Sequence, residues 1–287
     1  MYMLLTLSIV LAVLKSSLYN NYAKKETPDI ASVFRFNAVS YGIAVVVSLL
    51  FGIGDSLSLE TLFSAFFYAV IGCSLQAMSV VAMTKGKMSA TTLMVLYGMI
   101  IPAIAGPVFW KEKFRLIQGV GILLVLISMW LLRDNDSENK SAGKKWGIYA
   151  VICFFLSGFA GLTEKIHQST DGRDERTAFL FIAYLIMFLF SAIGIIATKN
   201  RGKKTKSLKP VVINGGVSGI IMSFYSLINL TLAGNLDSMV YYPIANGGSL
   251  ILTVFISIAV FKEKCSKKYI IGFLSGFLSV ILLSLGG

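Results

Sequence analysis

The stretch Trp110-Lys111-Glu112-Lys113-Phe114 closes one apolar segment of this 287-residue chain, and a close copy, Phe261-Lys262-Glu263-Lys264-Cys265, closes another. The copy lies 151 residues further on, and in both places a glycine, Gly121 or Gly272, follows the glutamate after nine residues. A repeat of about half the length of an apolar chain is typical of membrane proteins built from two structural repeats. The repeated phrase therefore predicts two related halves with a central site between them.

The composition indicates a lipid environment. Hydrophobic residues make up 56% of the chain and charged residues 14%, with a mean hydropathy of +0.77, whereas soluble domains average about 45–50% and about 25%. The net charge of +12 would also suit nucleic acid, but the Lys and Arg residues stand almost wholly in short gaps between apolar runs. There they act as topology signals. We therefore expect membrane lipid and a small-molecule substrate as partners, and no nucleic acid.

The sequence offers no reactive constellation. The three cysteines lie in or beside different apolar runs, without disulfide or metal-ligand spacing. The single histidine has no evident nucleophile as a partner, and no nucleotide-binding motif is present. We expect neither an enzyme nor a cofactor, and no transport powered by ATP within this chain.

The apolar segments predict an all-α integral membrane protein. A spanning helix needs about 20 mostly apolar residues, and these runs are too long and continuous for barrel strands. The ten expected transmembrane helices are 2–20, 32–53, 61–83, 88–110, 115–133, 146–168, 177–198, 210–233, 239–260 and 268–286. They divide into a first five-helix repeat over 1–134, a connecting loop over 135–145 and a second five-helix repeat over 146–287.

The loop charges predict the orientation. The odd-numbered loops between these helices hold eighteen Lys and Arg residues, and the even-numbered loops hold five. The positive-inside rule then places the odd loops, including Lys199–Lys209, in the cytoplasm and both termini outside a plasma membrane. Because each half has five helices, the two halves run oppositely through the membrane, and the repeat is inverted.

With these features the chain resembles the EamA-type, ten-helix members of the drug/metabolite transporter superfamily over essentially its whole length. The resemblance rests on Glu112 with Gln118 and Gly121, on Glu263 with Gly272, and on Lys15 and Arg35 in the first two helices. In the second half, Lys165 stands 150 residues after Lys15, but Arg35 has no counterpart in the seventh segment and Tyr269 replaces the glutamine. The resemblance implies the ten-helix fold and a transport role, and it names no cargo.

Polar side chains form stripes along four of the expected helices, at steps of three or four residues that place each set on one helix face. The stripes are Tyr242, Asn246, Ser249, Thr253 and Ser257; Asn214, Ser218, Met222, Tyr225 and Asn229; Ser157, Gly161, Glu164 and Gln168; and Ser64, Tyr68, Gly72 and Gln76. In lipid such a face meets either protein, as hydrogen bonds between helices, or a water-filled cavity. Four stripes together favour the cavity. The candidate substrate-binding residues are Gln76, Tyr97, Tyr225, Asn229, Tyr242 and Asn246.

Four charged residues inside the expected spans are candidates for coupling or gating. Glu164 is either a carboxylate at the membrane interface or a proton-coupling carboxylate, and Lys165 is adjacent to it. Lys15 and Arg35 are either structural partners at helix ends or charges in the cavity. For Glu112 the sequence favours a structural role beside the exposed amides of the next helix.

These features together predict a secondary active transporter of small polar or amphipathic organic solutes, such as amino acids, metabolites, organic cations or drug-like molecules. Proton coupling is the first expectation for its mechanism. Exchange or facilitated flow on the same fold, and a membrane sensor or scaffold without turnover, are the alternatives.

Overall fold

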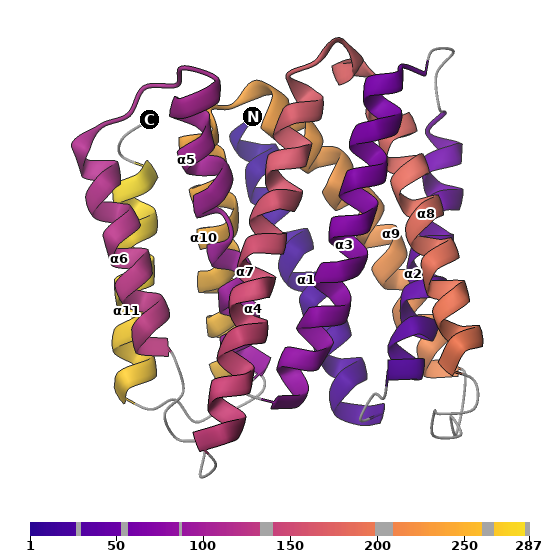
Figure 1. Cartoon of the computed structure of the whole chain (residues 1–287), viewed down its shortest axis with the longest axis horizontal. Helices are drawn as coiled ribbons and strands as arrows, with labels where there is room; N and C mark the ends of the chain where they lie inside the picture. Colours follow the sequence, from indigo (N-terminus) through magenta and orange to yellow (C-terminus); the bar gives the residue numbers. More distant parts are fainter. Residues whose placement is uncertain are drawn as a thin grey trace. The chain divides into compact units, whose positions relative to one another are not determined.

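The computed structural model describes residues 1–26, 30–52, 57–85, 88–132, 140–198, 209–259 and 267–284. These residues are helical apart from short turns (Figure 1). The helices are α1 (Tyr2–Glu26), α2 (Ile30–Leu50), α3 (Leu59–Lys85), α4 (Met88–Tyr97), α5 (Ile100–Phe109), α6 (Leu116–Leu132), α7 (Lys140–Gln168), the short 3₁₀ helix η1 (Asp171–Asp174), α8 (Arg176–Thr198), α9 (Lys209–Asn235), α10 (Ser238–Ala259) and α11 (Lys267–Ser284).

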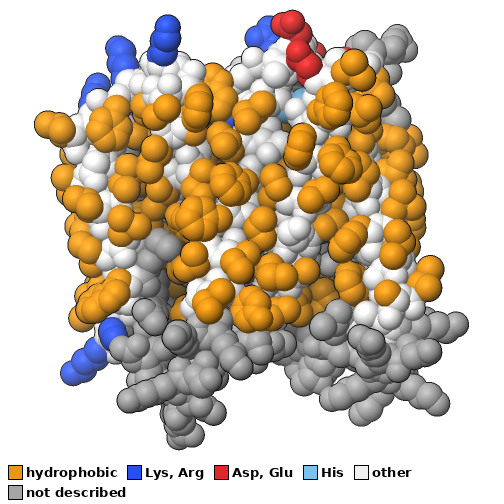
Figure 2. Space-filling view, in the orientation of Figure 1, with side chains coloured by type: hydrophobic (Ala, Val, Ile, Leu, Met, Phe, Trp, Pro, Cys, Tyr) orange, Lys and Arg blue, Asp and Glu red, His pale blue; other side chains and the backbone are white. Residues whose placement is uncertain are grey.

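Six helical segments of the described chain are long and apolar enough to cross a membrane. They are Ala31–Leu50, Leu59–Ala82, Thr91–Phe109, Trp146–Gln168, Arg176–Thr198 and Lys209–Asn235. Figure 2 shows hydrophobic side chains across the middle of the visible face and charged side chains near the helix ends. A helix satisfies its backbone groups internally, so lipid can cover such apolar faces. The structure is therefore that of a helical membrane protein.

One expected helix is interrupted. The segment expected as 88–110 forms α4 and α5, with Gly98 and Met99 between them. Gly98 lies against α7, where an added Cβ would stand 2.7 Å from the carbonyl oxygen of Phe154 and 2.8 Å from the amide nitrogen of Gly158. The backbones of two helices thus meet at the interruption, and the absence of a side chain makes this approach possible.

The described residues form two compact units, each with parts of both halves of the sequence. Unit 1 comprises Met1–Ile9, Ser74–Lys165 and Asn235–Gly287, and unit 2 comprises Val10–Cys73 and Ile166–Gly234. The chain therefore passes between the units inside α1, α3 and α7 and near the end of α9. The expected repeats, 1–134 and 146–287, concern similarity between halves, so their status as repeats stays a prediction.

In unit 1, α6 and α11 form an antiparallel pair with reciprocal contacts. Ser128 Oγ of α6 donates to the carbonyl of Gly272 on α11 at 2.5 Å. In return, an added Cβ on Gly121 of α6 would stand 3.0 Å from the carbonyl of Ser279 and 2.8 Å from Cγ of Leu283 on α11. Gly121 and Gly272 are 151 residues apart, and so are Ser128 and Ser279. Equivalent residues thus exchange contacts, and Gly121 permits a close helix approach as the sequence indicated.

In unit 2, α2 and α8 are the corresponding antiparallel pair. The rings of Tyr41 and Tyr184 stack with centroids 6.4 Å apart, and Phe34 meets Phe190 edge-on at 6.2 Å. An added Cβ on Gly194 would lie 2.5 Å from the Phe34 ring. Small residues under aromatic rings let these two helices pack closely.

Candidate functional site

The repeated phrase forms the turn between α5 and α6. Trp110 caps α5, and the backbone of Lys111 then takes a positive φ of 56°. A left-handed backbone costs a non-glycine residue about 1–2 kcal/mol, so other contacts must hold the turn. The Gly106 carbonyl accepts from the Trp110 amide at 2.9 Å and from the Glu112 amide at 3.4 Å. The turn thereby carries Glu112 back over α5, where a Cβ on Gly106 would collide with its carboxylate.

Glu112 forms a buried ion pair with Lys165, near the end of α7. Lys165 Nζ lies 3.2 Å from Glu112 Oε1, and the side chains of Lys165 and Glu112 are 10% and 6% exposed. Lys165 Nζ also donates to the Leu236 carbonyl at 3.0 Å and stands 5.9 Å from the centroid of the Trp110 ring. Removing one partner of a buried pair costs about 3–5 kcal/mol, because the other charge is left uncompensated.

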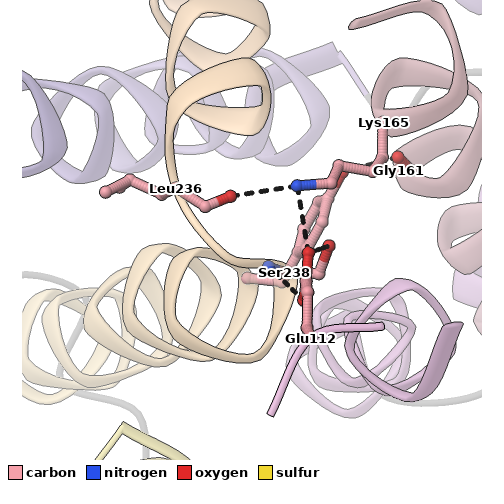
Figure 3. A network of polar contacts seen from close by, with 6 residues as sticks. Glu112, Gly161, Lys165, Leu236 and Ser238 are labelled. Carbon is pink, nitrogen blue, oxygen red and sulfur yellow. Dashed lines mark hydrogen bonds and ion pairs between the residues drawn. The ribbon is translucent and has the colours of Figure 1, made fainter. Parts of the chain in front are cut away.

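The same carboxylate caps α10. Glu112 Oε2 accepts from the backbone amide of Ser238 at 2.8 Å, and Oε1 accepts from the Ser238 hydroxyl at 3.1 Å. Ser238 is the first residue of α10, so a negative charge here also meets the positive end of the helix dipole. Figure 3 shows that the contacts come from the turn after α5, from α7 and from the turn between α9 and α10. We call Glu112, Lys165, Leu236 and Ser238 the Glu112 cluster.

The Glu112 cluster continues along α10 through two candidate substrate-binding residues. Tyr242 is 4% exposed, and its hydroxyl donates to the Gly161 carbonyl, one turn before Lys165, at 2.6 Å. Asn246 Nδ2 donates to the Tyr242 carbonyl at 3.1 Å. Ser238, Tyr242 and Asn246 are spaced by four residues and therefore share one face of α10. For Thr253 and Ser257, the last residues of that stripe, the side chains lie outside the described part.

Three other candidates belong to unit 1. Gln76 is half-buried on α3, and Glu164 is 9% exposed on α7. Tyr97, the last residue of α4, is fully buried, and its hydroxyl hydrogen-bonds that of Ser128. A Cβ on Gly276 would meet the same hydroxyl at 2.5 Å, so Tyr97 stands where α4, α6 and α11 pack together. Its role as a cavity wall stays a prediction, as do those of Gln76 and Glu164.

Unit 2 holds the remaining candidates. Lys15 Nζ of α1 stands 4.7 Å from the centroid of the Tyr225 ring on α9, a cation–π contact. Asn229, one turn after Tyr225, is 5% exposed, and Arg35 on α2 is half-buried. The structure thus brings Lys15 and Tyr225 together, a contact that the sequence did not suggest.

A second polar cluster in unit 2 surrounds the buried His167. Its Nε2 lies 3.1 Å from Thr61 Oγ1 and its Nδ1 lies 2.9 Å from Gln168 Nε2, while its ring lies 4.4 Å from that of Phe179. Gln168 Oε1 accepts from Arg176 Nε at 2.8 Å. Because arginine only donates, this bond turns the Gln168 amide nitrogen toward His167. The neutral imidazole with its proton on Nε2 therefore fits the contacts.

Sequence reasoning singled out Glu112 and Lys165 of the Glu112 cluster, but neither Leu236 nor Ser238, and it did not predict that these residues meet. It expected Glu112 beside the amides of α6, the next helix, whereas the carboxylate meets the first turn of α10. Gln118 takes the expected position instead, since its Oε1 accepts from the amide of Arg115 at 2.8 Å, just before α6 begins. One signal was available: alternating helices place the ends of the fourth and sixth spans on one side of the membrane. The repeat copy Glu263 lies outside the described residues.

Comparison with known proteins identifies the fold and no family. Within the described chain, no group of three or more His, Cys, Asp or Glu residues is arranged to hold a metal ion. No family model and no curated protein matches the sequence. Among 28 matching chains of solved structures, one described only as the crystal structure of a protein has a TM-score of 0.69 at 10% identity. The alignment covers 98% of both chains. At this identity the similarity establishes the fold alone.

Proposed function

We propose that this protein is a secondary active transporter of small polar or amphipathic organic solutes, with ten transmembrane helices in two inverted repeats. The observation that carries the proposal is the reciprocal contact between α6 and α11. Two residue pairs related by the same offset of 151 exchange partners across an antiparallel helix pair. A two-fold axis perpendicular to those helices produces this pattern, and for spanning helices that axis lies in the membrane plane.

A second contact in unit 1 supports the same symmetry. Gly98 of α4 lies against Gly158 of α7, and Gly248 of α10 lies against Ile9 of α1, where an added Cβ would stand 2.5 Å from Ile9 Cδ1. Gly248 follows Gly98 by 150 residues, and Phe159, beside Gly158, follows Ile9 by 150. Each of these contacts therefore joins one proposed half to the other: Gly98 meets the backbone of α7, and Gly248 meets the Ile9 side chain of α1. Inverted repeats of this kind are the usual architecture of secondary transporters, with the site where the repeats meet.

We also propose that this protein is a member of the EamA-type drug/metabolite transporters. This membership rests on the Glu-to-Gly signature after the fourth and ninth spans, and the structure adds a physical role for the first copy: Glu112 caps α10 and pairs with Lys165. Plasma-membrane location with both termini outside is proposed from the loop charges. In unit 1 the start of α1, the turn after α5 and the end of α11 lie at one end (Figure 1), as that topology requires.

Flux in proteoliposomes tests the function. Purified protein is first screened by thermal shift against amino acids, metabolites and organic cations, since a ligand that prefers the folded state raises apparent stability. The stabilising solutes are then assayed for uptake with and without an imposed proton gradient. Saturable uptake that increases with the gradient supports proton coupling, and uptake that requires solute on the opposite side supports exchange. Binding without any flux would refute transport and favour a sensor or scaffold.

Variants at the proposed site separate cavity residues from packing residues. Asn246→Ala and Asn229→Ala should weaken uptake while leaving expression and unfolding nearly unchanged, because a cavity side chain loses a ligand contact rather than a packing partner. Glu164→Gln should flatten the pH dependence of uptake if this carboxylate carries the proton. Unchanged uptake in all three variants would mean that the polar stripes only join helices.

A further inference from the structure

The Glu112 cluster lies beside two of the places where the chain passes between the units. The chain leaves unit 1 after Lys165, within α7, and returns to it at Asn235, directly before Leu236. We call these two points of the chain the crossings. The Lys165–Leu236 hydrogen bond of 3.0 Å therefore joins the unit 1 ends of both crossings. The unit 2 ends of the same two segments are also in contact, because an added Cβ on Gly234 would lie 2.8 Å from Gln168 Oε1.

When the ion pair opens, each charge loses its counter-charge but keeps contacts with neutral groups. Without Glu112, Lys165 retains the Leu236 carbonyl and the face of the Trp110 ring. Without Lys165, the Glu112 carboxylate retains the amide and the hydroxyl of Ser238. A buried pair that only stabilises a fold is costly to open, because separation leaves bare charges. Here each partner has its own second set of contacts.

The segment that carries Glu112 is also held in a strained conformation. Lys111 has the positive φ of 56°, which non-glycine residues rarely adopt. The contacts of Glu112 with Lys165 and Ser238 help to hold the turn in this conformation.

We propose that Glu112 and Lys165 form a releasable clasp, which holds the unit 1 ends of the two crossings together in one state of the protein and opens in another. Its place in a transport cycle rests on the proposed function. The clasp positions the segments that connect the units, and it does not contact the solute.

Hydrogen exchange tests the clasp without any ligand. Glu112→Gln keeps an oxygen acceptor for Ser238 but removes the charge, and Lys165→Met removes the other charge. Either variant should raise amide exchange at residues 161–165 and 235–240 at least tenfold, with α6 and α11 unchanged. Lys268→Met is the matched control, because Lys268 also stands over a tryptophan, 5.7 Å from the Trp130 ring centroid. Exchange at the two crossings no faster than in this control would overturn the proposal.

Cross-linking tests whether the clasp must open. Glu112→Cys and Lys165→Cys are combined in full-length protein whose native cysteines are replaced by serine, and are joined by a reducible bifunctional thiosulfonate. In proteoliposomes, uptake of a mixture of radiolabelled amino acids and choline should fall at least tenfold and return on reduction. Uptake that persists after complete cross-linking would show a static staple instead. If the uncross-linked protein takes up neither probe, transport of these solutes fails, while the exchange experiment still decides the clasp.

Discussion

Replacing Gly121 by alanine tests the contact on which the proposed repeat depends. An added Cβ would stand 2.8 Å from Leu283 Cγ and 3.0 Å from the Ser279 carbonyl, closer than unstrained carbon contacts of about 3.5–4.0 Å. The Leu283 side chain can shift, but the carbonyl belongs to α11 itself, so the two helices must separate. Overpacking of this kind costs about 1–3 kcal/mol.

Gly119→Ala, two residues earlier on α6, is the matched control. Its added Cβ would meet only the end of the Phe114 ring at 3.5 Å, which is ordinary contact. Both substitutions gain the same helix preference of alanine over glycine, about 1 kcal/mol, so this gain cancels in the comparison. We therefore expect Gly121→Ala to be less stable than Gly119→Ala by about 1–3 kcal/mol.

Denaturant titration in mixed micelles measures this difference. The three tryptophans, Trp110, Trp130 and Trp146, all belong to unit 1, so their fluorescence reports on the unit that contains α6 and α11. A Gly121→Ala protein as stable as Gly119→Ala would refute the close approach of the two helices, and with it the reciprocal contact.

Three further predictions concern other parts of the chain. Thr91→Val should destabilise unit 1 by about 1–3 kcal/mol, because the buried indole N–H of Trp146 loses the acceptor that it meets at 2.9 Å; the free energy of unfolding checks this, and Thr91→Ser, which keeps the hydroxyl, should lose less. Ser58→Ala should cost about 0.5–2 kcal/mol, because Ser58 Oγ accepts from the Thr61 amide at 3.2 Å at the start of α3; faster hydrogen exchange in residues 59–62 is the measurement, and exchange at the wild-type rate would contradict the cap. A cysteine placed in the Lys199–Lys209 loop should react with an impermeant maleimide only after cells are permeabilised, and labelling of intact cells would reverse the orientation inferred from the loop charges.

The positions of the helices follow from the sequence because local chemistry decides them. A segment of about 20 apolar residues must satisfy its backbone internally in lipid, so α8 was expected at 177–198 and occupies Arg176–Thr198. The close helix contact at Gly121, the glycine after the repeated phrase, could likewise be predicted, since a glycine inside a spanning helix commonly marks such a contact. The interruption at Gly98 and Met99 also had a local signal that the sequence analysis did not use. Pro102 has no amide hydrogen to donate to the Gly98 carbonyl four residues earlier, and the Gly98 carbonyl accepts from the Ile101 amide instead, at 3.0 Å.

The partners of the polar residues were decided by tertiary structure. Alternation of the spans places Lys165 on the same side of the membrane as Glu112, but it does not favour Lys165 over the neighbouring Lys111 or Lys113 as the partner of Glu112. That choice arises because α7 and the first turn of α10 meet the α5–α6 turn at one end of unit 1. The interleaving of both sequence halves in each compact unit has the same origin: hydropathy depends on each segment alone, whereas the contacts between segments depend on which surfaces fit. The sequence thus determined an all-helical membrane protein and its candidate residues, and the fold determined which of those residues meet.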